Sequence, residues 1–169
     1  MKPEKLLYYP LNGFEMQKMN PDAEIITYDK LNNISNINDL FKNTNKLIIL
    51  YMLHDWGGHW VCLIKNPNGT FTFWDSYGHR PDYQIDVLNN KQRKEYNEKT
   101  QRLHKLLKKY FVIYNNRCIQ GKGTQTCGCF ATHRLHHSEY SNPEYRYKFF
   151  NGKNPDLVVA GYCSKILNN

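Results

Sequence analysis

The sequence predicts an α+β fold in which a central helix that begins at Cys127 packs on a mostly antiparallel sheet. Two apolar runs of strand length, residues 47–53 and 59–64, indicate buried strands, because a strand covered on both faces reads as continuous apolar sequence. A turn signal follows at 65–69, and residues 70–76 resume β-rich alternation. The last two strands are therefore expected to pair as an antiparallel hairpin.

The remaining elements are expected as follows. The chain up to about Ser35 is polar with turn signals, and a short helix is expected around Leu40. Residues 89–110 predict one long amphipathic helix, since leucines recur at helical spacing and Lys and Arg occupy the opposite face. A further strand is predicted at 111–116, and the tail at 154–167 is expected to add a strand or helix at the periphery.

Length and composition fit a single domain that spans residues 1–169. No apolar run is long enough to cross a bilayer, so no membrane partner is expected. The first fourteen residues, MKPEKLLYYPLNGF, lack the sustained apolar stretch of a secretory signal. Five cysteines in such a chain indicate free thiols in a reducing compartment. We expect a monomer that stays inside a cell or compartment.

The net charge of +8 is open to two readings. Clustered Lys and Arg gain affinity for phosphates by releasing counterions, and lysine is also an ordinary solvated surface residue. A non-enzymatic nucleic-acid-binding module that uses the basic segment 91–109 is therefore one alternative. The sequence shows no DNA- or RNA-reading motif with interleaved aromatic residues, which counts against it.

Cys127 is the candidate nucleophile. It lies where a glycine-containing loop meets the predicted helix. Unpaired backbone N–H groups and the helix dipole at such a position lower the pKa of a thiol, and the thiolate is the reactive form. Cys62, by contrast, lies inside an apolar strand, and buried structural cysteines are common.

A nucleophilic cysteine needs a base, and the base needs an acceptor that orients it. His59 ends a Gly-Gly loop, and Asp75 follows sixteen residues later on the hairpin partner, so their side chains are expected to meet. Taken singly, they also fit a surface loop histidine and a turn-forming aspartate. Gln120, seven residues before Cys127, offers an amide that can stabilise an oxyanion together with the backbone N–H of Cys127.

A zinc site is the main competing interpretation of the cysteine-rich segment. Soft ligands are close together in the sequence: Cys118, Cys127, Cys129, His133, His136 and His137. Structural zinc sites usually present a C-x-x-C turn, whereas C-x-C at a helix start directs the two thiolates apart. No metal is therefore expected, and Cys129 is expected to be a small core residue. Three other histidines are expected to be ordinary loop or surface residues: His54, His79 and His104.

Three sequence blocks together resemble one protease family. The blocks GGHW at 57–60, FWDSYG at 73–78 and CIQGKGTQTCGCF at 118–130 resemble the His, acid, Gln and Cys blocks of adenain, the adenovirus-type maturation protease, and of its SUMO-deconjugating ubiquitin-like relatives. The resemblance covers roughly residues 47–137, and its residue order is opposite to that of papain. The seven-residue Gln-to-Cys interval is typical of the adenovirus branch, whereas an Asp as the acid is typical of the SUMO branch.

The resemblance implies a papain-like, adenain-like cysteine protease fold. It also implies a role for each matching residue: Cys127 as nucleophile, His59 as general base, Asp75 as orienting acid and Gln120 as oxyanion donor. By the same resemblance Trp60 lines the substrate cleft, where its flat ring excludes bulky residues and selects Gly.

The function implied is that of a cysteine endopeptidase that cleaves viral capsid precursor proteins after Gly during virion maturation, by thiolate attack and an acyl-enzyme intermediate. The short chain and its Asn/Lys-rich composition favour a DNA virus such as a virophage, with the enzyme in the virion and the host-cell viral factory. A deconjugase for a ubiquitin-like modifier is the enzymatic alternative. No cofactor is required by the sequence, and stimulation by DNA or by a viral peptide is left open.

Overall fold

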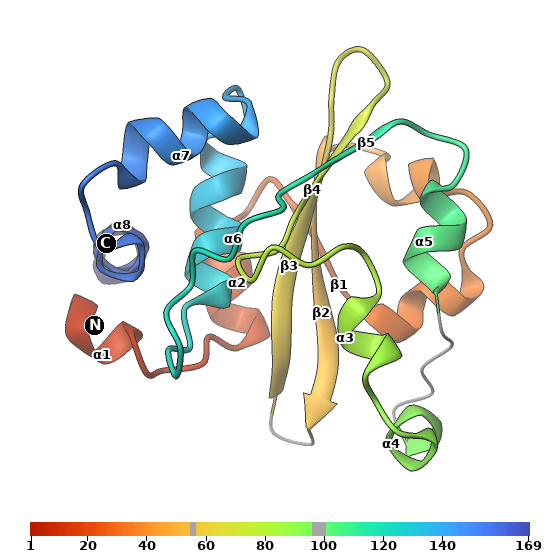
Figure 1. The fold of residues 1–169 in the computed structure, drawn as a ribbon, viewed down its shortest axis with the longest axis horizontal. Helices are drawn as coiled ribbons and strands as arrows, with labels where there is room; N and C mark the ends of the chain where they lie inside the picture. The colour runs from red at the N-terminus through yellow and green to blue at the C-terminus, as the bar shows by residue number, and fades with distance from the viewer. Residues whose placement is uncertain (55–56, 96–100) are drawn as a thin grey trace.

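The computed structural model of the chain describes residues 1–54, 57–95 and 101–169. The elements, in chain order, are α1 (Pro3–Leu6), α2 (Gly13–Met19), β1 (Glu24–Thr27), the 3-10 helices η1 (Tyr28–Asn33) and η2 (Ile37–Phe41), β2 (Lys46–His54), β3 (Gly57–Lys65), β4 (Phe71–Trp74), α3 (Tyr83–Asp86), α4 (Asn90–Glu95), α5 (Arg102–Leu107), β5 (Val112–Tyr114), α6 (Cys127–His136), α7 (Asn142–Phe150) and α8 (Pro155–Asn168). They form three layers, with the sheet between two groups of helices (Figure 1).

The sheet has the strand order β1-β2-β3-β4-β5. Its central pairings, β2 with β3 and β3 with β4, are antiparallel and contain most of the paired residues, as predicted. The hairpin turn between β3 and β4 places Gly69 at a φ of 81°, a conformation that glycine adopts without strain. Each edge strand pairs in parallel, β1 with β2 and β5 with β4, which the sequence pattern did not predict.

Two hydrophobic cores lie on opposite faces of the sheet. Successive side chains of a strand point to opposite faces, so Ile48 and Cys62 join the core under α6 while Leu47 and Leu63 join the core under η1 and α5. All four side chains are fully buried. Burial on both faces is the physical reason that β2 and β3 read as continuous apolar runs.

Helix α6 begins at Cys127, as predicted, and packs on β3 and α8. The tail forms a helix, α8, whose Val159, Ala160 and Cys163 are fully buried in the core under α6. The expected element is therefore present as a helix, and its buried side supplies one wall of that core. Helix α7, between α6 and α8, was not predicted.

The N-terminal segment is more ordered than its polar sequence suggests. Asn12, expected in a turn, is the N-cap of α2, with its side chain accepting a hydrogen bond from the backbone N–H of Glu15 at 2.9 Å. Helices as short as α1 and α2 are unstable alone, and burial of Leu6, Met16 and Met19 stabilises them. The short helix expected around Leu40 is present as η2.

The single helix predicted for residues 89–110 is wrong. Two short helices, α4 and α5, occupy this segment, and Gln101 directly before α5 has a left-handed φ of 57° that a continuous helix does not contain. Residues 96–100 lie outside the described part of the chain. The predicted apolar face exists nonetheless, since the three leucines of α5 are buried. None of the helices described combines the length and apolar character needed to cross a bilayer.

Candidate active site

His59 and Asp75 meet at the end of the β3–β4 hairpin, as predicted. His59 lies in β3, and Asp75 directly follows β4, one residue beyond the last pair of the register, Cys62 with Trp74. The Nε2 atom of His59 is 2.8 Å from Oδ1 of Asp75, and both residues are buried. A carboxylate on Nε2 fixes the orientation of the ring and leaves Nδ1 for another partner.

Asp75 is itself held in place by its neighbours. Its Oδ1 also accepts the backbone N–H of Tyr77 at 2.8 Å, and its backbone carbonyl accepts the amide of Asn115 at 2.8 Å. The ring of Tyr77 stacks on the imidazole of His59, with 4.8 Å between the ring centroids. The tight turn ends at Gly78, where φ is 76°. Sequence reasoning missed Tyr77 and Asn115, because neither carries reactive chemistry.

His79 is a partly exposed loop residue, as expected, and it lies close to the acid. Its Nδ1 atom lies 3.7 Å from Oδ2 of Asp75, and its ring stacks on Tyr83 with 4.0 Å between centroids. The Nδ1 atom of His79 accepts the side-chain amide of Gln84 at 3.2 Å, so His79 lies near Oδ2 of Asp75 without hydrogen-bonding to it, whereas His59 bonds to Oδ1.

Cys127 is buried at the first position of α6. Burial raises the pKa of its thiol, but the imidazole of His59 and hydrogen bonds from the backbone N–H groups of Trp60 and Gly128 outweigh burial, so the pKa lies below its ordinary value. Burial likewise opposes charge on His59, but the Asp75 carboxylate and the Cys127 sulfur raise the pKa of His59 to about 10. These two opposite shifts favour a thiolate–imidazolium pair at neutral pH.

Gln120 lies in the loop before α6, with its side-chain amide fixed at both ends. Its Oε1 accepts the hydroxyl of Ser76 at 2.6 Å, and its Nε2 donates to the carbonyl of Thr124 at 3.0 Å. A primary amide has two N–H groups, so one remains for a substrate oxygen. Ser76, next to the acid, is a further positioning residue that sequence reasoning missed.

A cavity of about 290 Å³ opens beside Cys127. Trp60 forms one wall, and its indole N–H donates to the carbonyl of Leu11 at 2.9 Å. A side chain at Gly128 would approach the Trp60 ring to 3.2 Å, so the ring is held against the start of α6. The rest of the lining comes from four segments: Pro10, Leu11, Asn12, Gly13, Leu50, Met52, Gly57, Gly58 and Gln125.

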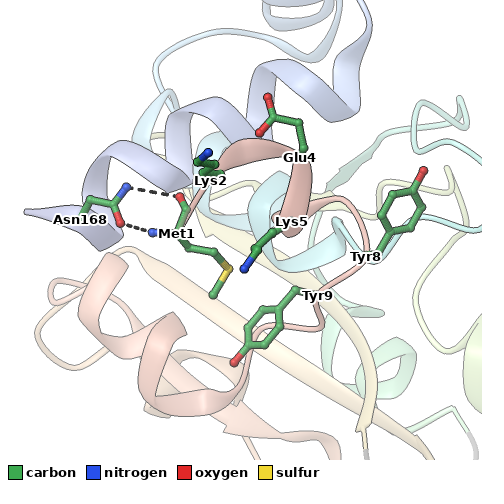
Figure 2. Close-up of a pocket in the computed structure, with 7 residues that line it drawn as sticks. All are labelled: Met1, Lys2, Glu4, Lys5, Tyr8, Tyr9 and Asn168. Atoms are coloured by element: carbon green, nitrogen blue, oxygen red, sulfur yellow. Dashed lines mark hydrogen bonds between the residues drawn. The ribbon is translucent and has the colours of Figure 1, made fainter.

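A larger hollow of about 1030 Å³ lies between α1 and the end of α8 (Figure 2). Its residues, which include Met1, Lys5 and Tyr9, are separate from the five site residues predicted from the sequence. We therefore place the candidate active site in the smaller cavity, which contains the reactive thiol.

The histidines of α6 serve packing. His133 hydrogen-bonds through Nδ1 to the hydroxyl of Tyr145 at 2.7 Å, and its ring stacks on His137 at 4.4 Å. Burial lowers the pKa of His133 to about 3, so the ring is neutral. Among the described residues, no group of three or more His, Cys, Asp or Glu side chains is placed to hold a metal ion. Cys129 is a buried core residue, and Cys118 is exposed.

Comparison with known proteins relates the chain to cysteine proteases. The family model described as "Ulp1 protease family, C-terminal catalytic domain" matches residues 9–154 of this chain. Uncharacterized protein V9 of the Sputnik virophage is 29% identical over 140 residues, which are 78% of this chain and 80% of V9.

Two solved structures share the fold at low sequence identity. The ASFV pS273R protease matches with a TM-score of 0.55 and 13% identity over 96% of this chain and 69% of its own. The central domain of Lpg1148 from Legionella pneumophila matches with a TM-score of 0.50 and 13% identity over 95% of this chain and 99% of its own.

Proposed function

Because the chain belongs to the Ulp1 protease family and matches its C-terminal catalytic domain, we propose that it is a viral maturation endopeptidase that cleaves capsid precursor proteins after Gly. Membership confirms the predicted cysteine peptidase class, and the α+β fold agrees with that of the viral protease described above. The predicted acid, Asp75, is an aspartate, which is typical of the SUMO branch of this family.

The catalytic assignment rests on the buried sulfur of Cys127, imidazole of His59 and carboxylate of Asp75. The pKa of the Cys127 thiol is lowered, and the pKa of the His59 imidazole is raised. The thiolate of Cys127 attacks the scissile carbonyl carbon, and the carbonyl oxygen becomes an oxyanion. The free N–H of Gln120 and the backbone N–H of Cys127 stabilise that charge. The imidazolium of His59 then protonates the leaving amine, and an acyl-enzyme remains.

Hydrolysis reverses these roles. The neutral imidazole of His59 takes a proton from water, and the resulting hydroxide adds to the thioester carbon. The second tetrahedral intermediate expels the Cys127 thiolate and releases the new carboxyl terminus. Asp75 accepts from Nε2 of His59, which orients the ring and stabilises its charged form.

A preference for Gly on the acyl side is supported by the shape of the cleft. The Trp60 ring is buried, tied to the carbonyl of Leu11 and packed at the start of α6, so it does not swing aside to admit a larger side chain. A rigid aromatic wall beside the sulfur leaves room for a main chain without a Cβ atom.

A viral precursor is supported as substrate by the virophage relative, which shares most of its length with this chain. The proposed places of action are the virion and the host-cell viral factory, with the enzyme acting as a monomer. The match to the Ulp1 description favours a second candidate, processing of a ubiquitin-like modifier after its terminal glycines.

DNA binding through the basic surface is supported by one groove. Lys105, Lys108 and Lys109 line a groove of about 650 Å³ beside α5. Arg102 of the same groove donates to backbone carbonyls, including that of Ile34 at 2.7 Å, and so supports the fold instead. Addition of duplex DNA at low salt is expected to raise turnover; unchanged turnover rejects the role of DNA.

The deciding experiment incubates the purified chain with capsid precursors of the same genome and maps new termini by mass spectrometry. New carboxyl termini that end in Gly are expected with the wild-type chain and none with Cys127→Ala. Cys118→Ser is the matched control, since Cys118 is exposed and does not line the cavity, and a serine hydroxyl keeps a donor for the carbonyl of Gln120. A ubiquitin-like fusion protein is the second substrate, and its cleavage in place of the precursors supports the alternative. Activity retained by Cys127→Ala rejects the mechanism.

A further inference from the structure

We propose that Asp156, at the start of α8, is a positioning residue that holds the oxyanion-binding loop, residues 120–127, in its catalytic shape. The proposal rests on the peptidase function proposed above and assigns a task to a residue outside the predicted site. Asp156 comes after the four predicted catalytic residues in the chain, in a helix that forms one wall of the core under α6.

Within the described part of the chain, the hydrogen bonds of the Asp156 carboxylate all go to this loop. Its Oδ2 accepts the backbone N–H of Gly121 at 2.8 Å, and its Oδ1 accepts the hydroxyl of Thr124 at 2.8 Å and that of Thr126. The residue is 5% exposed, and within the described ranges it takes part in no salt bridge. A buried carboxylate requires strong donors, so its charge makes these three loop contacts the stable arrangement.

The first consequence concerns the amide of Gln120. The Nε2 atom of Gln120 donates to the carbonyl of Thr124, and the hydroxyl of Thr124 donates to Asp156. Gly121, which directly follows Gln120 in the chain, donates its backbone N–H to Asp156 as well. Asp156 therefore fixes the residues on both sides of the Gln120 side chain. The N–H left for the oxyanion is aimed by this arrangement together with Ser76.

The second consequence concerns the start of α6. Thr126 is the N-cap residue, where a threonine hydroxyl normally accepts a backbone N–H of the first turn. Here the hydroxyl donates to Asp156, and in the described structure its side chain makes no cap bond. The first-turn N–H groups remain available, and that of Gly128 bonds to the sulfur of Cys127.

The contact between Gly121 and Asp156 also explains why the residue after Gln120 is small. A Cβ atom at Gly121 would lie 2.9 Å from Oδ2 of Asp156, closer than such atoms approach. A larger residue at position 121 would therefore push the Asp156 carboxylate away from the backbone N–H with which it bonds. The QG pair of the sequence is thus matched to a residue thirty-five positions further along the chain.

The first test needs no substrate and uses Asp156→Asn in the full chain. An amide offers one acceptor oxygen and places an NH₂ group against the remaining donors. Exchange of the Gly121 backbone amide with deuterated solvent, followed by NMR, is expected to be at least about tenfold faster in the variant. Asp22→Asn, which removes an exposed carboxylate paired with Lys46, is the matched control and is expected to leave this exchange unchanged. Unchanged exchange in Asp156→Asn overturns the proposal.

The second test separates positioning from general damage. Asp156→Asn and Thr126→Val are each expected to lower kcat by about 10- to 100-fold, the range for a displaced oxyanion donor, while KM changes little. Alkylation of Cys127 by iodoacetamide, which forms no oxyanion, should stay within about threefold of wild type. Thr126→Ser keeps the hydroxyl and should retain activity. An unchanged kcat, or a parallel fall in alkylation, overturns the proposal. A wild-type chain that cleaves no Gly-containing precursor rejects the proposed function instead, and the exchange measurement still decides the role of Asp156.

Discussion

Replacing Asp75 by Asn isolates the effect of its charge on the site. A single oxygen, Oδ1, accepts from both Nε2 of His59 and the backbone N–H of Tyr77, each at 2.8 Å. An asparagine oxygen in that place preserves both bonds, and its NH₂ group then lies where Oδ2 faces His79 at 3.7 Å. The variant keeps the orientation of the ring and loses the charge beside it.

The magnitude follows from the buried contact. A hydrogen bond to a charged group contributes about 1.5–3 kcal/mol, or roughly one to two pKa units at about 1.36 kcal/mol per unit. The pKa of His59, raised to about 10 in the wild-type chain, should fall by that amount. The folded value lies above the unfolded one, so the pair stabilises the fold fully below about pH 6.5 and less as the pH rises toward 10. The alkaline limb of turnover should therefore move down by about one to two pH units in Asp75→Asn.

The assay measures peptide turnover and Cys127 alkylation against pH in a Cys118→Ser background, because Cys118 is the exposed competing thiol. Turnover at pH 10 is expected to fall about 5- to 50-fold and turnover at pH 8 by no more than about twofold, because the imidazolium that protonates the leaving amine is lost at a lower pH in the variant. Asp22→Asn again serves as control. Turnover at pH 10 within twofold of wild type, with an unmoved alkaline limb, would refute the assignment of Asp75.

Three further substitutions test the cleft and the fold. Trp60→Ala should cost about 3–5 kcal/mol in urea denaturation and admit substrates with Ala or Val in place of Gly; an unchanged preference for Gly would reject Trp60 as the selecting wall. Gly58→Ala should lower the Tm markedly because a Cβ there would lie 1.7 Å from the carbonyl oxygen of Tyr51, whereas Gly57→Ala, with open space around it, should not; equal effects would contradict this geometry. Asn12→Ala should cost about 1 kcal/mol by loss of the α2 cap, while Asn12→Asp should retain the stability; no difference between them would exclude a capping role.

The centre of the fold was predictable because its signals are local. The apolar runs of β2 and β3, the glycine turn at Gly69 and the helix start at Cys127 each occupy a short stretch of sequence. The same holds for His59 and Asp75, which one hairpin brings together.

The remainder depends on contacts between distant segments. The short N-terminal helices exist because Leu6 and Met16 are buried under α6, and no periodic pattern of that length announces them. Asp156 reads as an ordinary residue in the first turn of a helix. Its contacts with the loop span thirty to thirty-five positions, so a sequence pattern did not identify its task.

The catalytic residues also differ in when synthesis supplies them. The base and the acid belong to one early hairpin, and local contacts of this kind form fast, whereas α8 leaves the ribosome after every other described helix. A growing chain that has reached α7 already contains Cys127 and His59 but lacks Asp156, whose carboxylate holds the loop that precedes α6. Full peptidase activity is therefore expected only after α8 has been synthesised and has packed beside α6.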